Sequence, residues 1–343
     1  TDALLRAAGR VDVEMWTRVI VSSLGMDRNG VVSQATLRDL DEDETRVVEI
    51  ERGVVLATGY FSANREMGMA HGRPEEHDDV EPLFQGATGD GISLAVALGA
   101  ATAGMRADDP PHFRTVDRPW VHPPAELFEA GAILVNLKGE RYVNELVGPE
   151  LATSRQQGKV GFLVFDARLA AQVATADQDT LPSRDGWYQE GRLFLSTFPE
   201  IGYGYVKDYL QCTDYFSDAG TVEGLAKFMK VSATSLGYTI HQVNQAAAGC
   251  GVDSFGRNLE GFGLGNPPLY ALGPIKAVLG SRGGLKVDRD MHVLDQSGQL
   301  IPHLYAAGMC GSSNTLLAGH GHALAWAFGT GRISGVNAAA IGS

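Results

Sequence analysis

Residues 53–59 read GVVLATG, residues 86–91 read GATGDG, and residues 301–308 read IPHLYAAG. The first and third stretches are short apolar runs that end on glycine, which is typical of a strand buried on both faces. GATGDG precedes small apolar residues and predicts a helix that continues to about Met105. A strand that ends on glycine beside a helix N-terminus presents N–H groups and a positive dipole, which favours a phosphorylated or flat ligand. Taken singly, each stretch is also typical of an ordinary tight turn.

The composition is that of a globular chain and not of a disordered one. Of 343 residues, 44% are hydrophobic and 20% are charged, and the length allows a full core and about two domains. Glycine contributes 43 residues, well above the roughly 7% usual for proteins. The net charge of −13 argues against a nucleic-acid partner or an anionic membrane surface, because both require clustered Lys and Arg.

Cysteine usage and the N-terminus indicate the expected compartment. Three widely spaced cysteines (Cys212, Cys250 and Cys310) predict neither a disulfide framework nor a metal site. The first sixteen residues, TDALLRAAGRVDVEMW, lack the apolar core of a signal peptide, and no stretch reaches the roughly 20 apolar residues of a membrane span. We therefore expect a cytoplasmic protein without a membrane span.

The order of elements predicts an α/β (α+β) body with an insertion. A helix is expected at residues 1–9, followed by an antiparallel meander over 11–21, 30–37 and 44–50. Further along the chain, the pattern predicts a hairpin over 131–143, a buried strand over 160–165, a helix over 222–229 and a last helix from about 319 to 340.

Five stretches in family order resemble flavoproteins of the fumarate reductase and succinate dehydrogenase superfamily. Residues 54–67, VVLATGYFSANREM, resemble the family's ATGGF-x-x-N-x-E-M segment, and residues 86–91 resemble its GATGDG helix start. Residues 131–145, GAILVNLKGERYVNE, are similar to the GAI-x-VN-x-x-G-x-RF-x-NE stretch of its cap domain. Residues 283–308 resemble its GGL-x-VD…IPGLYAAG return to the FAD domain, and GRISG at 331–335 is similar to its closing GRIAG.

The resemblance implies a fold and a cofactor. It implies a Rossmann-like FAD-binding domain from residues 1–107 and 266–343, with a fumarate-reductase-type cap domain inserted over residues 108–265. The family's opening strand–GxGxxG–helix, which holds the FAD pyrophosphate, has no match in these 343 residues. We therefore expect the first βαβ unit to be missing from this chain, and a second polypeptide that supplies it is a possible partner.

Cofactor contacts are carried over residue by residue from the same resemblance. It places Ala57, Thr58 and Gly59 along the FAD, and Thr88, Gly89 and Asp90 near its polyol and phosphates. It places Gly308 and Met309 at the family's AAGE position, and Gly321, Ala323 and Leu324 at flavin N1 and O2. Met309 stands where the family has an acid, so the carboxylate that the resemblance implies for a ribityl hydrogen bond is absent at this position.

The cationic groups that bind a dicarboxylate in fumarate reductases have no match. Their positions fall on Pro149, Ala318 and about Gly280, which argues against a fumarate reductase. The Tyr-Pro-Gly-x-Gly motif of the 3-ketosteroid Δ1-dehydrogenase branch falls on residues 317–321, where its glycines match but its tyrosine is Leu317.

Four residues are candidates for acid–base work. His320 and His322 flank Gly321 near the expected flavin edge, and an imidazole there is suited to relay a proton. Each is equally consistent with a hydrogen-bonded core histidine. Tyr60 replaces the second glycine of ATGGF and Tyr205 lies in an aromatic cluster of the cap, so either one is also consistent with plain packing.

The sequence therefore predicts an FAD-dependent oxidoreductase that transfers a hydride between flavin N5 and a CH–CH bond next to a carbonyl. A dehydrogenase or ene-reductase similar to 3-ketosteroid dehydrogenases fits better than a fumarate reductase, and we expect a bulky carbonyl compound as the small-molecule substrate. Two alternatives stay open: one subunit of a split flavoenzyme, and a non-catalytic scaffold derived from this family.

Overall fold

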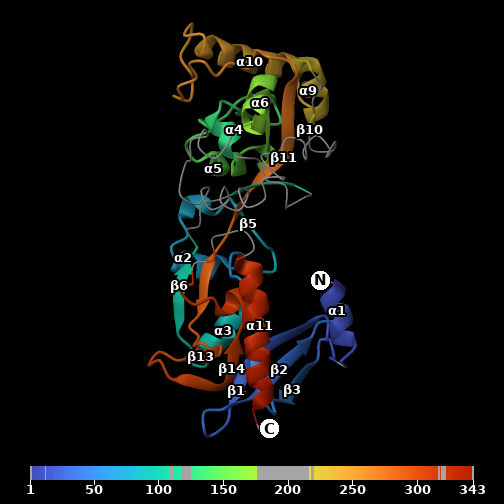
Figure 1. Ribbon diagram of the computed structural model, residues 1–343, viewed down its shortest axis with the longest axis vertical. Helices are drawn as coiled ribbons and strands as arrows, with labels where there is room; N and C mark the ends of the chain where they lie inside the picture. The colour runs from blue at the N-terminus through green and yellow to red at the C-terminus, as the bar shows by residue number, and fades with distance from the viewer. Residues whose placement is uncertain are drawn as a thin grey trace.

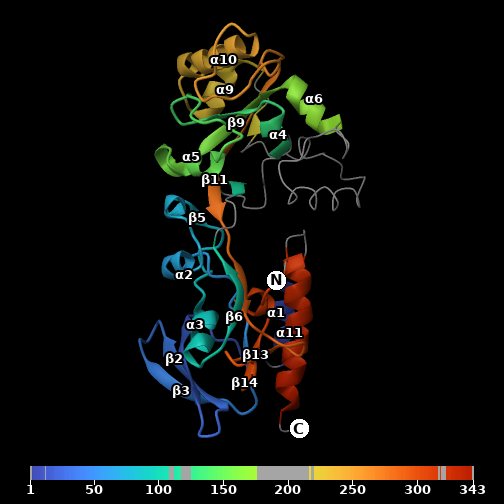
Figure 2. The same ribbon diagram turned by 90° about the vertical axis from the view of Figure 1, so that its left-hand side faces the viewer.

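The computed structural model describes residues 2–11, 13–107, 112–116, 125–175, 216–217, 220–315, 317 and 322–341. These residues form two lobes stacked along the long axis of the molecule (Figure 1). Strands β5 (Glu81–Pro82) and β11 (Leu269–Leu279) lie at the neck between the lobes (Figures 1 and 2).

The lower lobe has three layers. The first is a meander of β1 (Val19–Met26), β2 (Val32–Asp39) and β3 (Thr45–Glu49) in that order. The second is a sheet in the order β13-β14-β4, and the third is the long helix α11 on the far side (Figure 2). The bounds of these elements are β4 (Val54–Leu56), β13 (His292–Leu294), β14 (Leu300–Ala306) and α11 (His322–Ala340).

The meander confirms the sequence prediction, although its first strand begins at Val19 and not at residue 11. Its first turn forms because the Asp27 carboxylate accepts hydrogen bonds from the main-chain N–H groups of Asn29 (2.8 Å) and Val31 (2.9 Å). Gly30 supplies the positive φ of +75° that this turn requires.

The helix predicted from GATGDG to about Met105 is wrong in its second half. Helix α3 (Asp90–Ala97) ends early, and Gly99 then adopts a φ of +92°. The chain continues as β6 (Thr102–Arg106), which pairs antiparallel with β12 (Arg282–Leu285). Pairing with β12, which is distant in the sequence, therefore makes residues 102–106 a strand, although their local sequence also suits a helix.

Helix α1 (Asp2–Gly9) confirms the helix expected at residues 1–9. The other short elements of the lower lobe are α2 (Arg65–Ala70) and the 3-10 turns η1 (Glu75–His77) and η3 (Gly308–Gly311). Asn64 caps α2, because its side chain accepts a hydrogen bond from the N–H of Met67.

The upper lobe is built on a sheet in the order β10-β11-β9-β8, to which β5 and β7 add by pairing with β11. All six residues of β9 are buried, which confirms the predicted buried strand. The hairpin expected over residues 131–143 reduces to β8 and one bridge between Val135 and Arg141. Bounds are β7 (His112–Thr115), β8 (Ile133–Val135), β9 (Gly161–Asp166) and β10 (Phe216–Ser217).

Helices cover this sheet (Figure 1). They include α9, which confirms the helix predicted over residues 222–229. Their bounds are α4 (Ala125–Glu129), α5 (Pro149–Ser154), α6 (Ala167–Thr175), α9 (Val222–Met229) and α10 (Ala233–Ala247), with a 3-10 turn η2 (Gln157–Lys159).

Each lobe has its own hydrophobic core within the part of the chain that the structure describes. Leu56, Ile92 and Leu304 belong to the lower core, and Leu134, Phe165 and Leu225 belong to the upper one. Residues 269–275 of β11 pack in the upper core, although the predicted division assigns them to the FAD-binding part. The division at 107/108 and 265/266 stays a prediction.

A buried ion network holds the upper core together. Glu145 is fully buried and accepts two hydrogen bonds of 2.8 Å from Arg141, one of 2.7 Å from Arg257 and one of 2.9 Å from the N–H of Leu134. Arg141 also pairs with Asp253, so both guanidinium groups are compensated. The network joins the segment after β8 to the loop that precedes β11.

We expect Glu145→Gln to destabilise the upper lobe by about 3–5 kcal/mol, because it leaves two buried arginines short of a carboxylate. Urea unfolding followed by circular dichroism measures this effect. The matched control is Glu140→Gln on the surface, which we expect to cost less than about 0.5 kcal/mol. Equal stability of the two variants would contradict the assigned role of the network.

Candidate cofactor and active site

The ends of β4 and β14 lie side by side. The two strands are parallel, with Leu304 opposite Val54 and Ala306 opposite Leu56. The pairing extends past the strands, because the N–H of Ala307 donates to the carbonyl of Leu56 at 2.9 Å. The two glycine-ended stretches, Ala57–Gly59 and Ala307–Gly308, therefore leave the sheet at the same edge.

The GATGDG turn lies at this edge as well. The N–H of Gly91 donates to Thr58 Oγ1 at 3.2 Å, and the N–H of Gly89 donates to the carbonyl of Tyr60 at 3.1 Å. Only glycine fits at position 91, since a Cβ would lie 2.5 Å from Thr58 Oγ1. The N-terminus of α3 thus sits directly against the end of β4.

Helix α11 holds the end of β14 through two hydrogen bonds. The N–H of Gly308 donates to Thr330 Oγ1 at 2.9 Å, and the indole N–H of Trp326 donates to the Gly308 carbonyl at 3.1 Å. Neither side chain was predicted as a site residue from the sequence. Thr330, Ser334 and Ala338 recur every four residues and are the buried positions of the helix, and this spacing was the available signal.

Cys310 packs behind the site and was also missed. Its side chain is buried beneath Thr58, with which it is hydrogen-bonded. Burial raises the pKa of the Cys310 thiol, and the Thr58 hydrogen bonds only partly oppose this. The thiol therefore stays protonated near neutral pH and supports Thr58 without acting as a nucleophile.

The exposed groups at this edge fit a phosphorylated dinucleotide. Thr58, Thr88 and Asp90 are exposed, and a Cβ on Gly59 or Gly86 would meet nothing within 4 Å. Hydroxyls, free main-chain surface at glycine and the positive end of an eight-residue helix suit the polyol and phosphates of FAD.

The predicted cofactor residues are not all equally placed for contact. Ala57 is exposed and Met309 half-buried at the edge, and Ala323 and Leu324 form the first turn of α11. Gly89 is buried, and a Cβ there would lie 2.9 Å from Met67 Sδ and from Phe61 Cβ, so its glycine is required by packing. Contact of FAD with these residues stays a prediction.

Two of the four acid–base candidates belong to the described residues. Tyr60 follows Gly59 and stacks on Phe84, with ring centroids 6.3 Å apart. His322 is exposed at the start of α11, beside a hollow of about 440 Å³ that Leu317, Trp326 and Thr330 also line. His320, Gly321 and Tyr205 lie outside the described residues.

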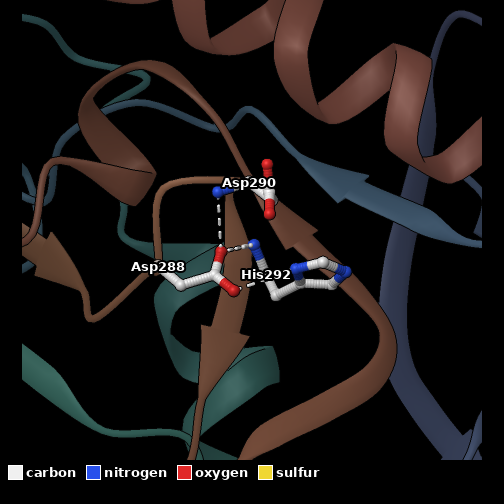
Figure 3. A group of neighbouring side chains, drawn as sticks. All are labelled: Asp288, Asp290 and His292. Carbon is white, nitrogen blue, oxygen red and sulfur yellow. Dashed lines mark hydrogen bonds and ion pairs between the residues drawn. The ribbon is translucent and has the colours of Figure 1, made fainter.

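A second cluster, Asp288, Asp290 and His292, brings possible metal ligands within 4.8 Å of one another (Figure 3). Asp288 accepts hydrogen bonds of 2.9 Å from the N–H groups of Asp290 and His292, and it lies 3.0 Å from His292 Nδ1. These bonds close the turn before β13, so the turn itself accounts for the cluster.

Two parallel strand ends, a glycine-rich turn and a helix N-terminus at one edge define a nucleotide-binding protein of the Rossmann type. A family model described as "FAD binding domain" matches residues 1–323. The chain therefore belongs to this FAD-binding family, within the fumarate reductase-like flavoprotein superfamily, and the prediction of FAD as cofactor is confirmed.

Known relatives and a solved structure are similar along most of the chain. A 3-oxosteroid 1-dehydrogenase of Mycobacterium tuberculosis is 28% identical over 305 residues, which cover 82% of this chain and 51% of the relative. A vinyl phenol reductase of Lactiplantibacillus plantarum is 28% identical over 362 residues, covering 98% and 70%. The open conformation of a flavocytochrome c3 fumarate reductase has a TM-score of 0.68 at 23% identity, covering 98% and 54%, and so shows the fold.

The chain thus spans about half the length of the first of these relatives. Among the described residues, none of the helices combines the length and apolarity required to cross a membrane.

We expect Gly91→Ala to destabilise the lower lobe by about 1–3 kcal/mol, because the added methyl displaces Thr58 and breaks its bond to the α3 N-terminus. Urea unfolding and FAD titration, followed by flavin absorbance, measure the loss of stability and of affinity. Gly335→Ala on α11 is the matched control. Its Cβ meets nothing within 4 Å, so it should stabilise the helix by about 0.5–1 kcal/mol. A Gly91→Ala protein as stable as this control would refute the tight contact.

Proposed function

We propose that this protein is an FAD-dependent oxidoreductase that transfers a hydride between flavin N5 and a CH–CH bond next to a carbonyl. The observation that carries the proposal is the edge where β4, β14 and the N-terminus of α3 meet. There a chain of an FAD-binding family exposes Thr58, Thr88 and Asp90 around open glycines.

The two relatives support this chemistry. One is named for the dehydrogenation of an oxosteroid and the other for the reduction of a vinyl phenol. The comparisons give no support to a second polypeptide, so the proposal does not include one.

A substrate less anionic than a dicarboxylate agrees with two of the positions that carry cations in fumarate reductases. Pro149 is buried at the first position of α5, and Gly280 is buried after β11. Neither residue has a cationic side chain that could pair with a carboxylate. This supports a 3-ketosteroid dehydrogenase-like enzyme with a bulky carbonyl substrate.

The chain's own groups would position the reactants and handle the proton. Bound FAD would supply the two-electron redox chemistry. The first turn of α11, with the main chain of Ala323 and Leu324, would stabilise negative charge through the helix dipole. His322, and His320 by its place in the sequence, would hold or deliver a proton, since an imidazole ring carries two nitrogens that can donate or accept one. Tyr60 and Tyr205 are the next candidates for this role.

We expect the purified native protein to show flavin absorbance between 350 and 500 nm, which is the range where oxidised FAD absorbs, and to bleach on reduction. The bleached flavin should reoxidise, or the oxidised flavin should bleach, on addition of an unsaturated or saturated carbonyl compound. A preparation that stays colourless with added FAD would contradict the proposal and favour a non-catalytic scaffold.

We expect His320→Ala or His322→Ala to lower turnover by at least ~100-fold, because a positioned proton carrier contributes about that factor. FAD absorbance, measured in parallel, should not change. His241→Ala on the exposed face of α10 is the matched control and should retain turnover. Wild-type rates in both active-site variants would move the assignment to the tyrosines.

A further inference from the structure

Cys310 and Thr58 are in contact directly below the cofactor edge. Cys310 is fully buried, whereas Thr58 is exposed just after the end of β4. A Cβ on Gly91 would lie 2.5 Å from Thr58 Oγ1 and 3.2 Å from Cys310 Sγ, so both atoms flank the same point at the start of α3. Packing against Gly91 therefore limits how far either atom can move.

The sulfur of Cys310 accepts hydrogen bonds from Thr58. Burial raises the pKa of the thiol, and hydrogen bonds with the side chain and with the main chain of Thr58 lower it. A hydrogen bond lowers the pKa of a thiol when it stabilises the thiolate, so Thr58 is the donor in both bonds. The hydroxyl proton of Thr58 is thus directed into the protein and away from the cofactor edge.

The remaining hydrogen-bonding capacity of Thr58 can be counted. A threonine hydroxyl has one proton and two lone pairs. Cys310 takes the proton, and the N–H of Gly91 donates to one lone pair at 3.2 Å. One lone pair is left for a ligand, so Thr58 presents an acceptor and no donor. Phosphate oxygens are acceptors, whereas the hydroxyls of the ribityl chain and of the ribose in FAD can donate to Thr58.

We propose that Cys310 is a positioning residue for the cofactor. By accepting the hydroxyl proton of Thr58, it makes Thr58 an acceptor that recognises a sugar hydroxyl of FAD and not its phosphates. The inference rests on the proposed function, because it concerns the cofactor edge of that same site. Cys310 acts through Thr58 and needs no reactivity of its own, which agrees with its complete burial.

A double-mutant cycle on the full chain tests this role, with the dissociation constant of FAD as the readout. Thr58→Val and Cys310→Val should each weaken FAD binding by about 3- to 10-fold, the range expected for one neutral hydrogen bond. The double variant should bind FAD no more weakly than Thr58→Val alone, because both changes remove the same contact. Independent effects that multiply in the double variant would overturn the inference.

Cys310→Ser separates positioning from packing. A serine oxygen still accepts a hydrogen bond from Thr58, whereas valine fills the space without an acceptor. We therefore expect Cys310→Ser to bind FAD nearly as tightly as the wild type and Cys310→Val to bind it more weakly. A residue that only fills space gives the opposite order, because a polar group is costlier to bury than an apolar one. Val32→Ala removes buried volume from the meander, controls for lost stability alone, and should leave FAD affinity unchanged.

Competition with parts of the cofactor identifies the group that Thr58 contacts. Riboflavin carries the ribityl hydroxyls, adenosine carries the ribose hydroxyls, and inorganic pyrophosphate carries neither. Thr58→Val should weaken competition by riboflavin or by adenosine as much as it weakens FAD binding, and it should leave competition by pyrophosphate unchanged. A loss confined to pyrophosphate refutes the inference.

The proposed function stands or fails by a different measurement. A protein that turns over carbonyl compounds but shows independent effects in the cycle keeps its function and loses this inference. Coupled effects in a protein that binds FAD without turnover give the reverse result. If Cys310→Val does not fold, Cys310→Ala takes its place in the cycle, since alanine also lacks an acceptor.

Discussion

The lower lobe depends on main-chain segments that approach one another more closely than side chains permit. A Cβ on Gly284 would lie 2.4 Å from the Cys310 carbonyl oxygen, and one on Gly311 would lie 2.5 Å from that of Ala306. This contact presses η3 between β12 and the end of β14. Cys310 is thereby held beneath Thr58, and Gly308 is presented to α11. These contacts fix the edge where the ends of β4 and β14 meet the N-terminus of α3, because each of these elements packs against its neighbour there.

The upper lobe is organised by charge instead of by close backbone contact. Glu145 and the two arginines that it binds lie inside a core of aliphatic and aromatic side chains. A buried ion group of this kind adds little net stability compared with apolar packing, but it tolerates only one arrangement of its partners. It therefore specifies how the loop over residues 253–257 meets the segment after β8.

Strand β11 joins these two differently built lobes. Its first half packs in the upper core, and its second half pairs with β5 and β7 at the neck (Figure 1). At the neck, the guanidinium of Arg114 from β7 lies over the ring of Phe84, which in turn stacks on Tyr60.

The sequence alone determined the meander, the buried strands that end on glycine, the last helix and the family, because apolar periodicity and glycine placement are local properties. It also predicted which strand ends and helix starts would meet. Only the tertiary structure decided that residues 102–106 pair as a strand, that Gly89 is packed, and that Thr330 and Trp326 hold Gly308. The stack of Arg114, Phe84 and Tyr60 was equally hidden. These features depend on partners far away in the chain, and no local pattern encodes a partner that only folding brings near.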